Sequence, residues 1–210
     1  MNGPAQRTDP QFELIAGNVC LDFVNTLDDR FSDQPKELLA AYRHLARFAA
    51  EAGILPRSQV DGLQARGKES PEPARRALES AIRMREAMSQ VFYALVRHEP
   101  VPKPALALLN RFAQNAALHS NLVRANEHFE WQFDASRDDL EAPLWPIARS
   151  AADLLASDQL QFVRECASNT CRWLFLDESK NHRKRWCDMS KCGNRAKVRN
   201  FYQRQRKASA

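Results

Sequence analysis

The chain has 210 residues, 44% of them hydrophobic and 27% charged, which is typical of a soluble globular protein with one sizeable domain or one domain and a small appended module. No apolar run reaches the roughly 18 residues that a membrane span needs, and the N-terminal residues lack the apolar stretch of a secretory signal, so we expect a cytoplasmic protein with no membrane partner. The net charge of +5 is distributed unevenly along the chain. Residues 159–210 hold 13 Lys and Arg against 4 Asp and Glu, whereas residues 1–158 hold 18 against 22. This distribution favours a polyanion-binding segment on a near-neutral body, with a solvated basic tail as the alternative.

The first part of the chain is predicted to be mainly helical. Residues 1–10 are polar, and we expect them to be flexible. Residues 12–27 are expected to form an extended piece, a turn and then a segment that periodicity leaves open between helix and strand. The segment Ser32–Pro35 indicates a helix start, and apolar residues then recur at helical spacing until Gly53. Further helices are predicted over residues 58–67, 72–97, 103–117 and 143–156.

A small β-hairpin is predicted before the last of these helices. Aromatic and polar residues alternate from Phe129 to Asp134, as in a strand with one buried face. Residues 122–125 can pair with this strand across Asn126-Glu127.

Four of the five cysteines lie in the basic segment, spaced C-x4-C, fifteen residues, C-x4-C. Two ligand pairs on separate turns can place four thiolates at the corners of a tetrahedron, which is the geometry of a structural zinc site. We therefore predict one structural Zn²⁺ bound by Cys166, Cys171, Cys187 and Cys192. Four inert buried thiols and a redox dithiol are weaker alternatives, because few apolar residues are available to bury the thiols and C-x-x-C spacing is missing.

A hairpin is predicted between the two cysteine pairs, with residues 172–177 and 183–186 as its strands. Three aromatic residues are expected to form a small core beside the metal: Trp173, Phe175 and Trp186. A module of about fifty residues buries little surface, so we expect zinc to supply folding energy as well as geometry.

A helix from Lys191 to about Arg206 is predicted to follow, capped by Ser190 and carrying Cys192 in its first turn. One face of this helix is apolar, through Val198, Phe201 and Tyr202. The exposed basic side can neutralise phosphates and read base edges in a major groove; a solvated face and an acidic protein partner are the alternatives. The residues predicted to bind nucleic acid are Arg183, Lys184, Arg185, Lys191, Asn194, Arg195, Lys197, Arg199, Arg204 and Arg206.

Together these patterns predict an α+β fold that is mainly α, with a helical N-terminal domain that includes a small β-hairpin and a C-terminal treble-clef-like zinc finger. The boundary is expected near Ser157-Asp158, where apolar periodicity ends and the charge changes sign. This divides the chain into flexible residues 1–10, a domain over residues 11–157 and a basic finger over residues 158–210.

Two stretches resemble known families. Trp186-Cys-Asp-Met-Ser-Lys-Cys-Gly-Asn-Arg195, with Cys166–Cys171 and Trp173–Asp177 upstream, resembles the CGNR zinc finger, named for the residues that stand here at 192–195. Val19-Cys-Leu-Asp-Phe-Val-Asn-Thr26 resembles the opening signature of the ABATE domain, which precedes this finger in the same architecture. The resemblance covers nearly the whole chain. It implies a bacterial, stress-linked transcription regulator, cytoplasmic and nucleoid-associated, with zinc-dependent DNA binding and an N-terminal domain that senses a ligand.

The ABATE-like signature holds polar residues among apolar ones. With an arginine of the longest predicted helix, they are candidates to line an effector pocket between body and finger: Asp22, Asn25, Thr26 and Arg85. The alternative is that they cap a helix and satisfy buried backbone groups.

No enzyme activity is expected. A four-thiolate zinc site leaves no open coordination position, and zinc deaminase, G-x-S-x-G, Walker A and G-x-G-x-x-G motifs are missing. The leading hypothesis is a zinc-dependent regulator that binds double-stranded DNA. The alternatives are a protein-interaction adaptor that docks an acidic partner, and an RNA-binding module that stacks bases on Trp173, Trp186 or Tyr202. No heptad seam predicts a dimer, so the oligomeric state stays open.

Overall fold

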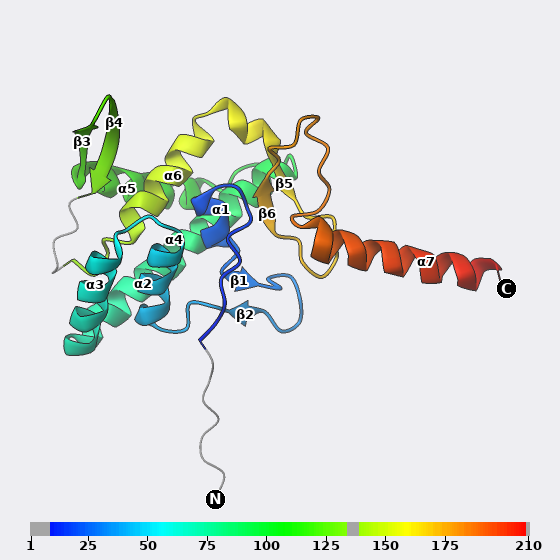
Figure 1. The fold of residues 1–210 in the computed structure, drawn as a ribbon, viewed down its shortest axis with the longest axis horizontal. Coiled ribbons are helices and arrows are strands. Elements are labelled where there is room, and N and C mark those ends of the chain that lie inside the picture. The colour runs from blue at the N-terminus through cyan, green and yellow to red at the C-terminus, as the bar shows by residue number, and fades with distance from the viewer. Residues whose placement is uncertain (1–8, 134–138, 209–210) are drawn as a thin grey trace, which may run out of the picture.

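The computed structural model describes residues 9–133 and 139–208, and this part combines seven α-helices with three two-stranded antiparallel sheets (Figure 1). The α-helices are α1 (Val19–Val24), α2 (Tyr42–Glu51), α3 (Arg57–Glu69), α4 (Pro71–Val96), α5 (Lys103–Leu118), α6 (Leu144–Leu155) and α7 (Asn194–Ala208). The strands are β1 (Leu27–Asp28), β2 (Lys36–Glu37), β3 (Ser120–Ala125), β4 (His128–Phe133), β5 (Val163–Glu165) and β6 (Leu174–Leu176). A 3-10 turn, η1 (Asp158–Phe162), and a π-helical turn, η2 (Met189–Gly193), complete the set. In α7, the described side chains are those of residues 194–199, 201, 202 and 205.

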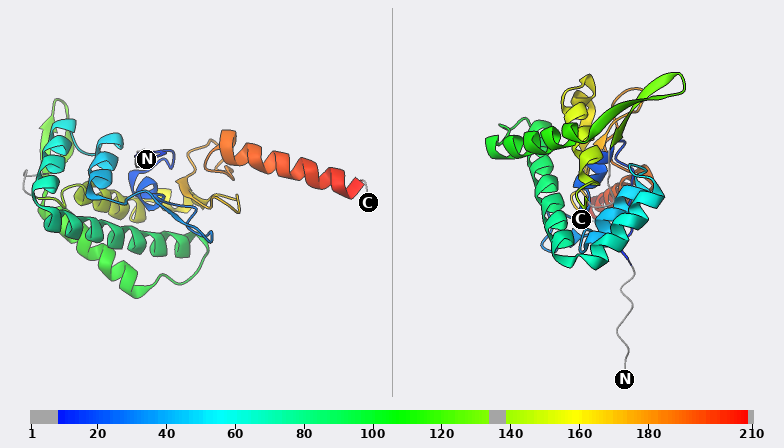
Figure 2. Two further views of the ribbon diagram at one scale, coloured as in Figure 1. Left: turned by 90° about the horizontal axis from the view of Figure 1, so that it is seen from below. Right: turned by 90° about the vertical axis from the view of Figure 1, so that its left-hand side faces the viewer.

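The 26-residue helix α4 is the centre of the fold. It contacts α1, α2, α3, α5 and α6, and Figures 1 and 2 show these helices gathered around it. Apolar side chains recur along it at helical spacing and are completely buried, among them Met84, Met88 and Phe92. The predictions of α3, α4, α5 and α6 are therefore confirmed, because a 3.6-residue period is a local signal that packing reinforces. Within the described chain, no helix combines the length and apolarity that crossing a membrane requires.

The helix predicted to start at Ser32 is wrong over its first part, because β1 and β2 pair there and α2 begins only at Tyr42. The reason is a charge buried elsewhere in the fold. Arg85 of α4 is 1% exposed, and β2 brings Glu37 against it, so that the two Nη atoms each donate to a carboxylate oxygen at 2.6 Å. A buried guanidinium needs such a partner, and this long-range demand outweighs the local capping signals.

The segment that periodicity left open is helical. Helix α1 follows Asn18, whose side chain accepts a hydrogen bond from the Cys20 N–H (3.1 Å). Cys20, Leu21 and Phe23 are completely buried, so α1 is a core element between α4 and α6.

The hairpin predicted around Asn126-Glu127 is confirmed. Ala125 lies opposite His128, which leaves the two turn residues between the strands, and Asn126 has the left-handed φ of 56° that a tight hairpin turn favours. The expected buried face is wrong, since Phe129 and Trp131 are 65% and 47% exposed. The hairpin stands at the edge of the molecule (Figure 1). The alternation of aromatic and polar residues therefore identifies a strand, but the core does not cover the aromatic face of that strand. Asp134, the last residue of the predicted strand, lies outside the described residues.

The C-terminal segment packs directly on the helical body. Strands β5 and β6 pair with each other; β5 contacts α4 and β6 contacts α1. The Leu176 N–H donates to the Ala16 carbonyl oxygen (2.7 Å), and Arg97, the residue that follows α4, forms a salt bridge with Glu165 of β5 (2.9 Å). These contacts fix the start of the finger relative to the body, whereas α7 projects away from the rest of the molecule (Figures 1 and 2).

Candidate metal centre and nucleic-acid interface

Four cysteine side chains converge at the base of α7. The Sγ atoms of Cys166, Cys171, Cys187 and Cys192 all lie within 4.8 Å of one another. A tetrahedral ion with Zn–S bonds of about 2.3 Å needs sulfur–sulfur separations of about 3.8 Å. Two pairs have this spacing, Cys171–Cys187 at 3.6 Å and Cys187–Cys192 at 3.8 Å. The cluster is compatible with one structural Zn²⁺, as predicted.

The first cysteine pair sits on the loop between β5 and β6. Cys166 directly follows β5, and its N–H donates to the Trp173 carbonyl oxygen (2.8 Å), so the loop closes tightly and holds Cys171 beside Cys166. Arg172 ends the loop with a left-handed φ of 57°. The loop is therefore the turn of the β5–β6 hairpin.

The predicted pairing of the two strands between the cysteine pairs is wrong. Residues 172–177 were expected to pair with residues 183–186, but β6 pairs with β5, and residues 183–186 form an irregular loop. Asp177 shapes this loop, because its carboxylate accepts a hydrogen bond from the Lys184 N–H (2.8 Å). The Asp177 side chain thus provides the Lys184 N–H with the hydrogen-bond partner that a neighbouring strand would otherwise have provided.

In the second cysteine pair, Cys187 precedes the π-helical turn η2 and Cys192 lies within it. Asp188, rather than the predicted Ser190, caps this turn, since its carboxylate accepts hydrogen bonds from the Ser190 N–H (2.6 Å) and the Lys191 N–H (3.4 Å). The Cys192 N–H donates to the Asp188 carbonyl oxygen (3.0 Å), which places the last sulfur in the first turn, as expected.

Gly193 and Asn194 shape the turn that carries Cys192. A Cβ at Gly193 would lie 2.4 Å from the sulfur of Met189, whose exposed and flexible side chain would have to move aside. The Asn194 side-chain amide donates to the Ser190 carbonyl oxygen (2.9 Å). Asn194 was predicted to bind nucleic acid, but its amide is engaged within the turn.

Four neighbouring thiols cannot all ionise on their own. Hydrogen bonds from Cys171 and Cys187 lower the pKa of Cys166, whereas the bond to Cys166 raises the pKa of Cys171 and Cys187, and burial raises the pKa of Cys192. A divalent cation would hold all four as thiolates. Because four sulfurs complete its coordination, such an ion is structural rather than catalytic.

The aromatic core predicted beside the metal is shared with the body. Trp173 and Phe175 are buried and Trp186 is partly buried. The Trp173 indole N–H donates to the Asp28 carboxylate (2.9 Å), which ties the finger to β1.

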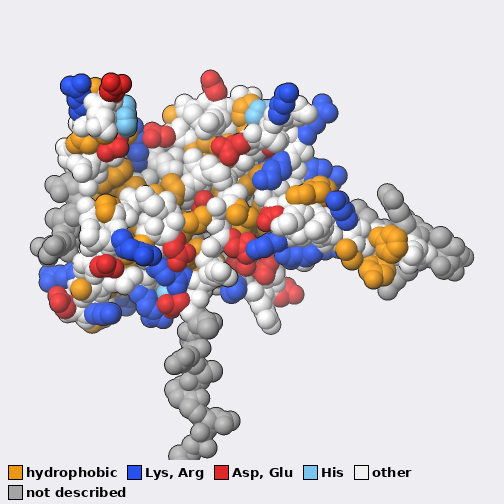
Figure 3. Space-filling model, in the orientation of Figure 1, with side chains coloured by type: hydrophobic (Ala, Val, Ile, Leu, Met, Phe, Trp, Pro, Cys, Tyr) orange, Lys and Arg blue, Asp and Glu red, His pale blue; other side chains and the backbone are white. Residues whose placement is uncertain are grey.

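Exposed basic side chains surround the metal centre and the start of α7 (Figure 3). Those that the structure describes as exposed are Arg183, Lys184, Arg185, Lys191, Arg195, Lys197 and Arg199. The side chains of Arg204 and Arg206 lie outside the described part. Helix α7 has 15 residues, or about 22 Å at 1.5 Å per residue, and so has the dimensions of a helix that enters a major groove.

Two of these cations lie close to acidic residues of the body. Lys191 forms an ion pair with Glu13. Arg195 lines a cavity of about 120 Å³ together with Asp28 and Asp29, next to the cysteine cluster. The basic charge at the base of α7 is therefore partly offset, which the sequence did not indicate because the acidic partners lie far upstream.

The predicted apolar face of α7 is uncovered among the described residues. Val198, Phe201 and Tyr202 are 55%, 57% and 60% exposed. Figure 3 shows hydrophobic side chains exposed along this helix.

The residues considered for an effector pocket are Asp22, Asn25, Thr26 and Arg85, and all four are engaged inside the chain. The Thr26 hydroxyl donates to the Phe23 carbonyl oxygen (2.7 Å) and accepts from Arg85 (3.3 Å), which also binds Glu37, as described above, and Glu86 (3.0 Å). The Asp22 carboxylate accepts from the Ala16 N–H (2.9 Å), and burial raises the pKa of Asp22 to about 6 despite this bond. Asn25 binds backbone groups of β6.

Comparison with known families agrees with this geometry. The ABATE model, described as "Putative stress-induced transcription regulator", matches residues 17–158, which is more than half of the chain. The CGNR zinc finger model matches residues 163–205. Both descriptions are regulatory or zinc-finger rather than enzymatic. No curated protein gave a match.

Proposed function

Given that the chain belongs to the ABATE family and ends in a CGNR zinc finger, we propose that it is a transcription regulator that binds duplex DNA through this finger and α7. The observation that carries the proposal is the placement of a four-cysteine cluster at the base of a projecting basic helix. The cluster joins the β5–β6 loop to η2, so a bound zinc ion would fix the direction in which α7 leaves the body.

The basic side chains fall into two sets with different tasks. Arg183, Lys184 and Arg185 lie on the irregular loop beside the metal, where they can neutralise phosphates and set the register of the finger on the duplex. Arg195 and Arg199 are one turn apart on α7, and guanidinium groups at this spacing can reach base edges in a major groove. Such an interface would show strong salt dependence.

A second candidate is a protein-interaction adaptor. The specific observation in its favour is the exposed apolar face of Val198, Phe201 and Tyr202. A single-stranded RNA module has less support, because Trp173 is buried and engaged with Asp28, which leaves Tyr202 and the half-buried Trp186 as stacking platforms.

Selection from a random duplex pool by the zinc-loaded full chain tests the proposal. We expect a defined motif to be enriched, and the enrichment to be lost in Cys192→Ser. Cys20→Ala is the matched control, since this cysteine lies outside the cluster. Failure to retain any duplex at low salt, with retention of single-stranded RNA or of a protein partner instead, would overturn the assignment.

The other sequence expectations stay predictions. They are the division into residues 11–157 and 158–210, a nucleoid location in the cytoplasm, and an effector pocket at Asp22, Asn25, Thr26 and Arg85. The internal hydrogen bonds of those four residues favour a structural role for them.

A further inference from the structure

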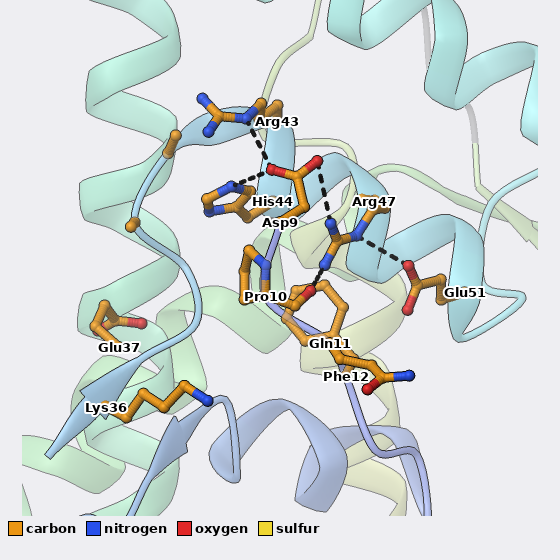
Figure 4. Close-up of a pocket in the computed structure, with 12 residues that line it drawn as sticks. Asp9, Pro10, Gln11, Phe12, Lys36, Glu37, Arg43, His44, Arg47 and Glu51 are labelled. Carbon is orange, nitrogen blue, oxygen red and sulfur yellow. Dashed lines mark hydrogen bonds and ion pairs between the residues drawn. The ribbon is translucent and has the colours of Figure 1, made fainter. Parts of the chain in front are cut away.

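A cavity of about 1000 Å³ lies beside the N-terminal end of α2, far from the cysteine cluster in sequence (Figure 4). Arg43, His44 and Arg47 of α2 line it, and Lys36 reaches it from β2. No side chain caps the first turn of α2, so the start of the helix adds its own positive end to the charges of Lys36, Arg43 and Arg47. This volume is in the range of cavities that hold small molecules.

A carboxylate of the chain already occupies the cationic corner of this cavity. Asp9 contacts His44 at 3.3 Å, and both Arg43 and Arg47 at 3.4 Å (Figure 4). All three distances are longer than the 2.7–2.9 Å or so of a good charge-assisted hydrogen bond. The adjacent Pro10 carbonyl oxygen also accepts a hydrogen bond from Arg47. Asp9 comes from the extended segment before α1, not from a packed helix or strand.

The cavity also has polar and charged groups that Asp9 does not contact. His44 is 4% exposed, its Nε2 faces Asp9, and its buried Nδ1 has no hydrogen-bond partner among the described residues. Buried polar atoms of this kind are usually hydrogen-bonded to protein or to ordered water. Glu37 is neutralised by Arg85 and Glu51 by Arg47, so Lys36 and Arg43 leave a positive site once Asp9 moves away.

We infer that this cavity binds a small carboxylate-bearing molecule, whose carboxylate replaces that of Asp9 against Arg43, His44 and Arg47. The carboxylate class follows from the group that occupies the corner, where one oxygen meets Arg43 and His44 and the other meets Arg47. Lys36, on the other side of the cavity, suits a second anionic group of the same ligand (Figure 4).

The segment that carries Asp9 also touches the finger. Four residues after Asp9, Glu13 pairs with Lys191 of η2, and the Ala16 carbonyl oxygen accepts from Leu176 of β6. Between the two contacts, Phe12 is buried and packs on Phe48 and under Arg47. A carboxylate ligand that engages Arg47 therefore has a physical route to the metal module through this segment.

Isothermal titration calorimetry with succinate, on the zinc-loaded full chain at constant ionic strength, tests the inference independently of DNA binding. We expect succinate to bind the parent chain, and to bind Asp9→Ala more tightly by about five-fold or more, because the competing carboxylate is removed. Arg43→Gln and Arg47→Gln should each weaken binding at least about ten-fold, whereas Arg75→Gln, an exposed arginine on α4, should leave it unchanged.

Three results would overturn the inference. The first is no heat of binding with either the parent chain or Asp9→Ala, and the second is equal succinate affinity in Arg43→Gln and the parent. Arg43 is exposed, and its ion pair among the described residues is with Asp9, so its variant is expected to fold. Binding of inorganic phosphate in place of succinate would also overturn it, since the ligand class would then be wrong. Succinate should also change the hydrogen exchange of the Leu176 amide in the parent but not in Arg47→Gln.

Discussion

Asn25, the residue that follows α1, binds both backbone groups of Leu174 in β6. Its Nδ2 donates to the Leu174 carbonyl oxygen at 2.9 Å, and its Oδ1 accepts from the Leu174 N–H at 3.1 Å. The side-chain amide thus does for β6 what a neighbouring strand would do, and it joins residues 149 positions apart. Through these two hydrogen bonds Asn25, a polar residue of the ABATE-like signature, acts as a clamp between the helical body and the finger.

Replacing Asn25 by leucine should destabilise the zinc-loaded protein by about 2–4 kcal/mol, because two buried backbone groups lose their partners. Urea unfolding measures this cost. Asn110→Leu, on the exposed side of α5, is the control and should change the free energy of unfolding by less than about 0.5 kcal/mol. Equal stability of the two variants would contradict the clamp.

The ion pair of Glu37 and Arg85 should be much more sensitive than an exposed pair. Glu37→Gln leaves the buried Arg85 guanidinium with only Glu86 as a charged partner, so we expect a loss of about 3 kcal/mol or more. Glu79→Gln removes an exposed pair with Arg75 and should cost less than about 1 kcal/mol. Similar unfolding midpoints in guanidinium chloride for the two variants would argue against Arg85 as the organiser of β2.

Asp22 should make the protein less stable as the pH rises. Burial raises its pKa from 3.8 to about 6 in the folded chain, so the folded state holds its proton more tightly than the unfolded state. Its contribution is neutral below about pH 4 and becomes unfavourable as the pH rises from 4 to 6, reaching about 3 kcal/mol above pH 6.

Asp22→Asn should therefore be more stable than the parent at pH 7, and the two should converge as the pH falls towards 4. The difference between the two proteins removes the pH dependence that zinc binding imposes on both. The measurement is the free energy of unfolding of each at intervals of half a pH unit. A difference that is constant with pH would rule out the raised pKa.

Zinc should be held by the four cysteines as one ion per chain. Cys192→Ser should lose the metal on dialysis, since three thiolates leave the tetrahedron open, and should also lose thermal stability because structural zinc contributes to folding. Atomic emission spectrometry gives the zinc content directly. Cys20→Ala should keep one zinc per chain, and full zinc retention by Cys192→Ser would show that the cluster is not the site.

Local sequence signals predicted the long helices and the metal centre, but not the contacts between body and finger. The period of Met84, Met88 and Phe92 identifies α4, and the spacing of the cysteines identifies the cluster, because each signal is complete within a short stretch. Strands β1 and β2 form because Arg85, nearly fifty residues away, requires Glu37.

Local sequence patterns also could not predict the pairing of β6 with β5. It depends on Asn25 holding one side of Leu174, and on Asp177 satisfying the loop that was expected to be the second strand. The ion pair in which Glu13 offsets the charge of Lys191 was missed for the same reason, since no residue near Lys191 in the sequence indicates it.

The most direct test of the DNA-binding proposal is the affinity for a fluorescently labelled duplex, measured by anisotropy over a range of salt concentrations. We predict a steep linear fall of log affinity with log salt for the zinc-loaded chain. Arg199→Ala should weaken binding and reduce the slope by about 1, while Arg111→Ala on α5 should change neither. The affinity should collapse in Cys192→Ser. If the metal-free Cys192→Ser protein binds the duplex as tightly as the zinc-loaded parent, with the same salt slope, then the finger is not the DNA-binding element.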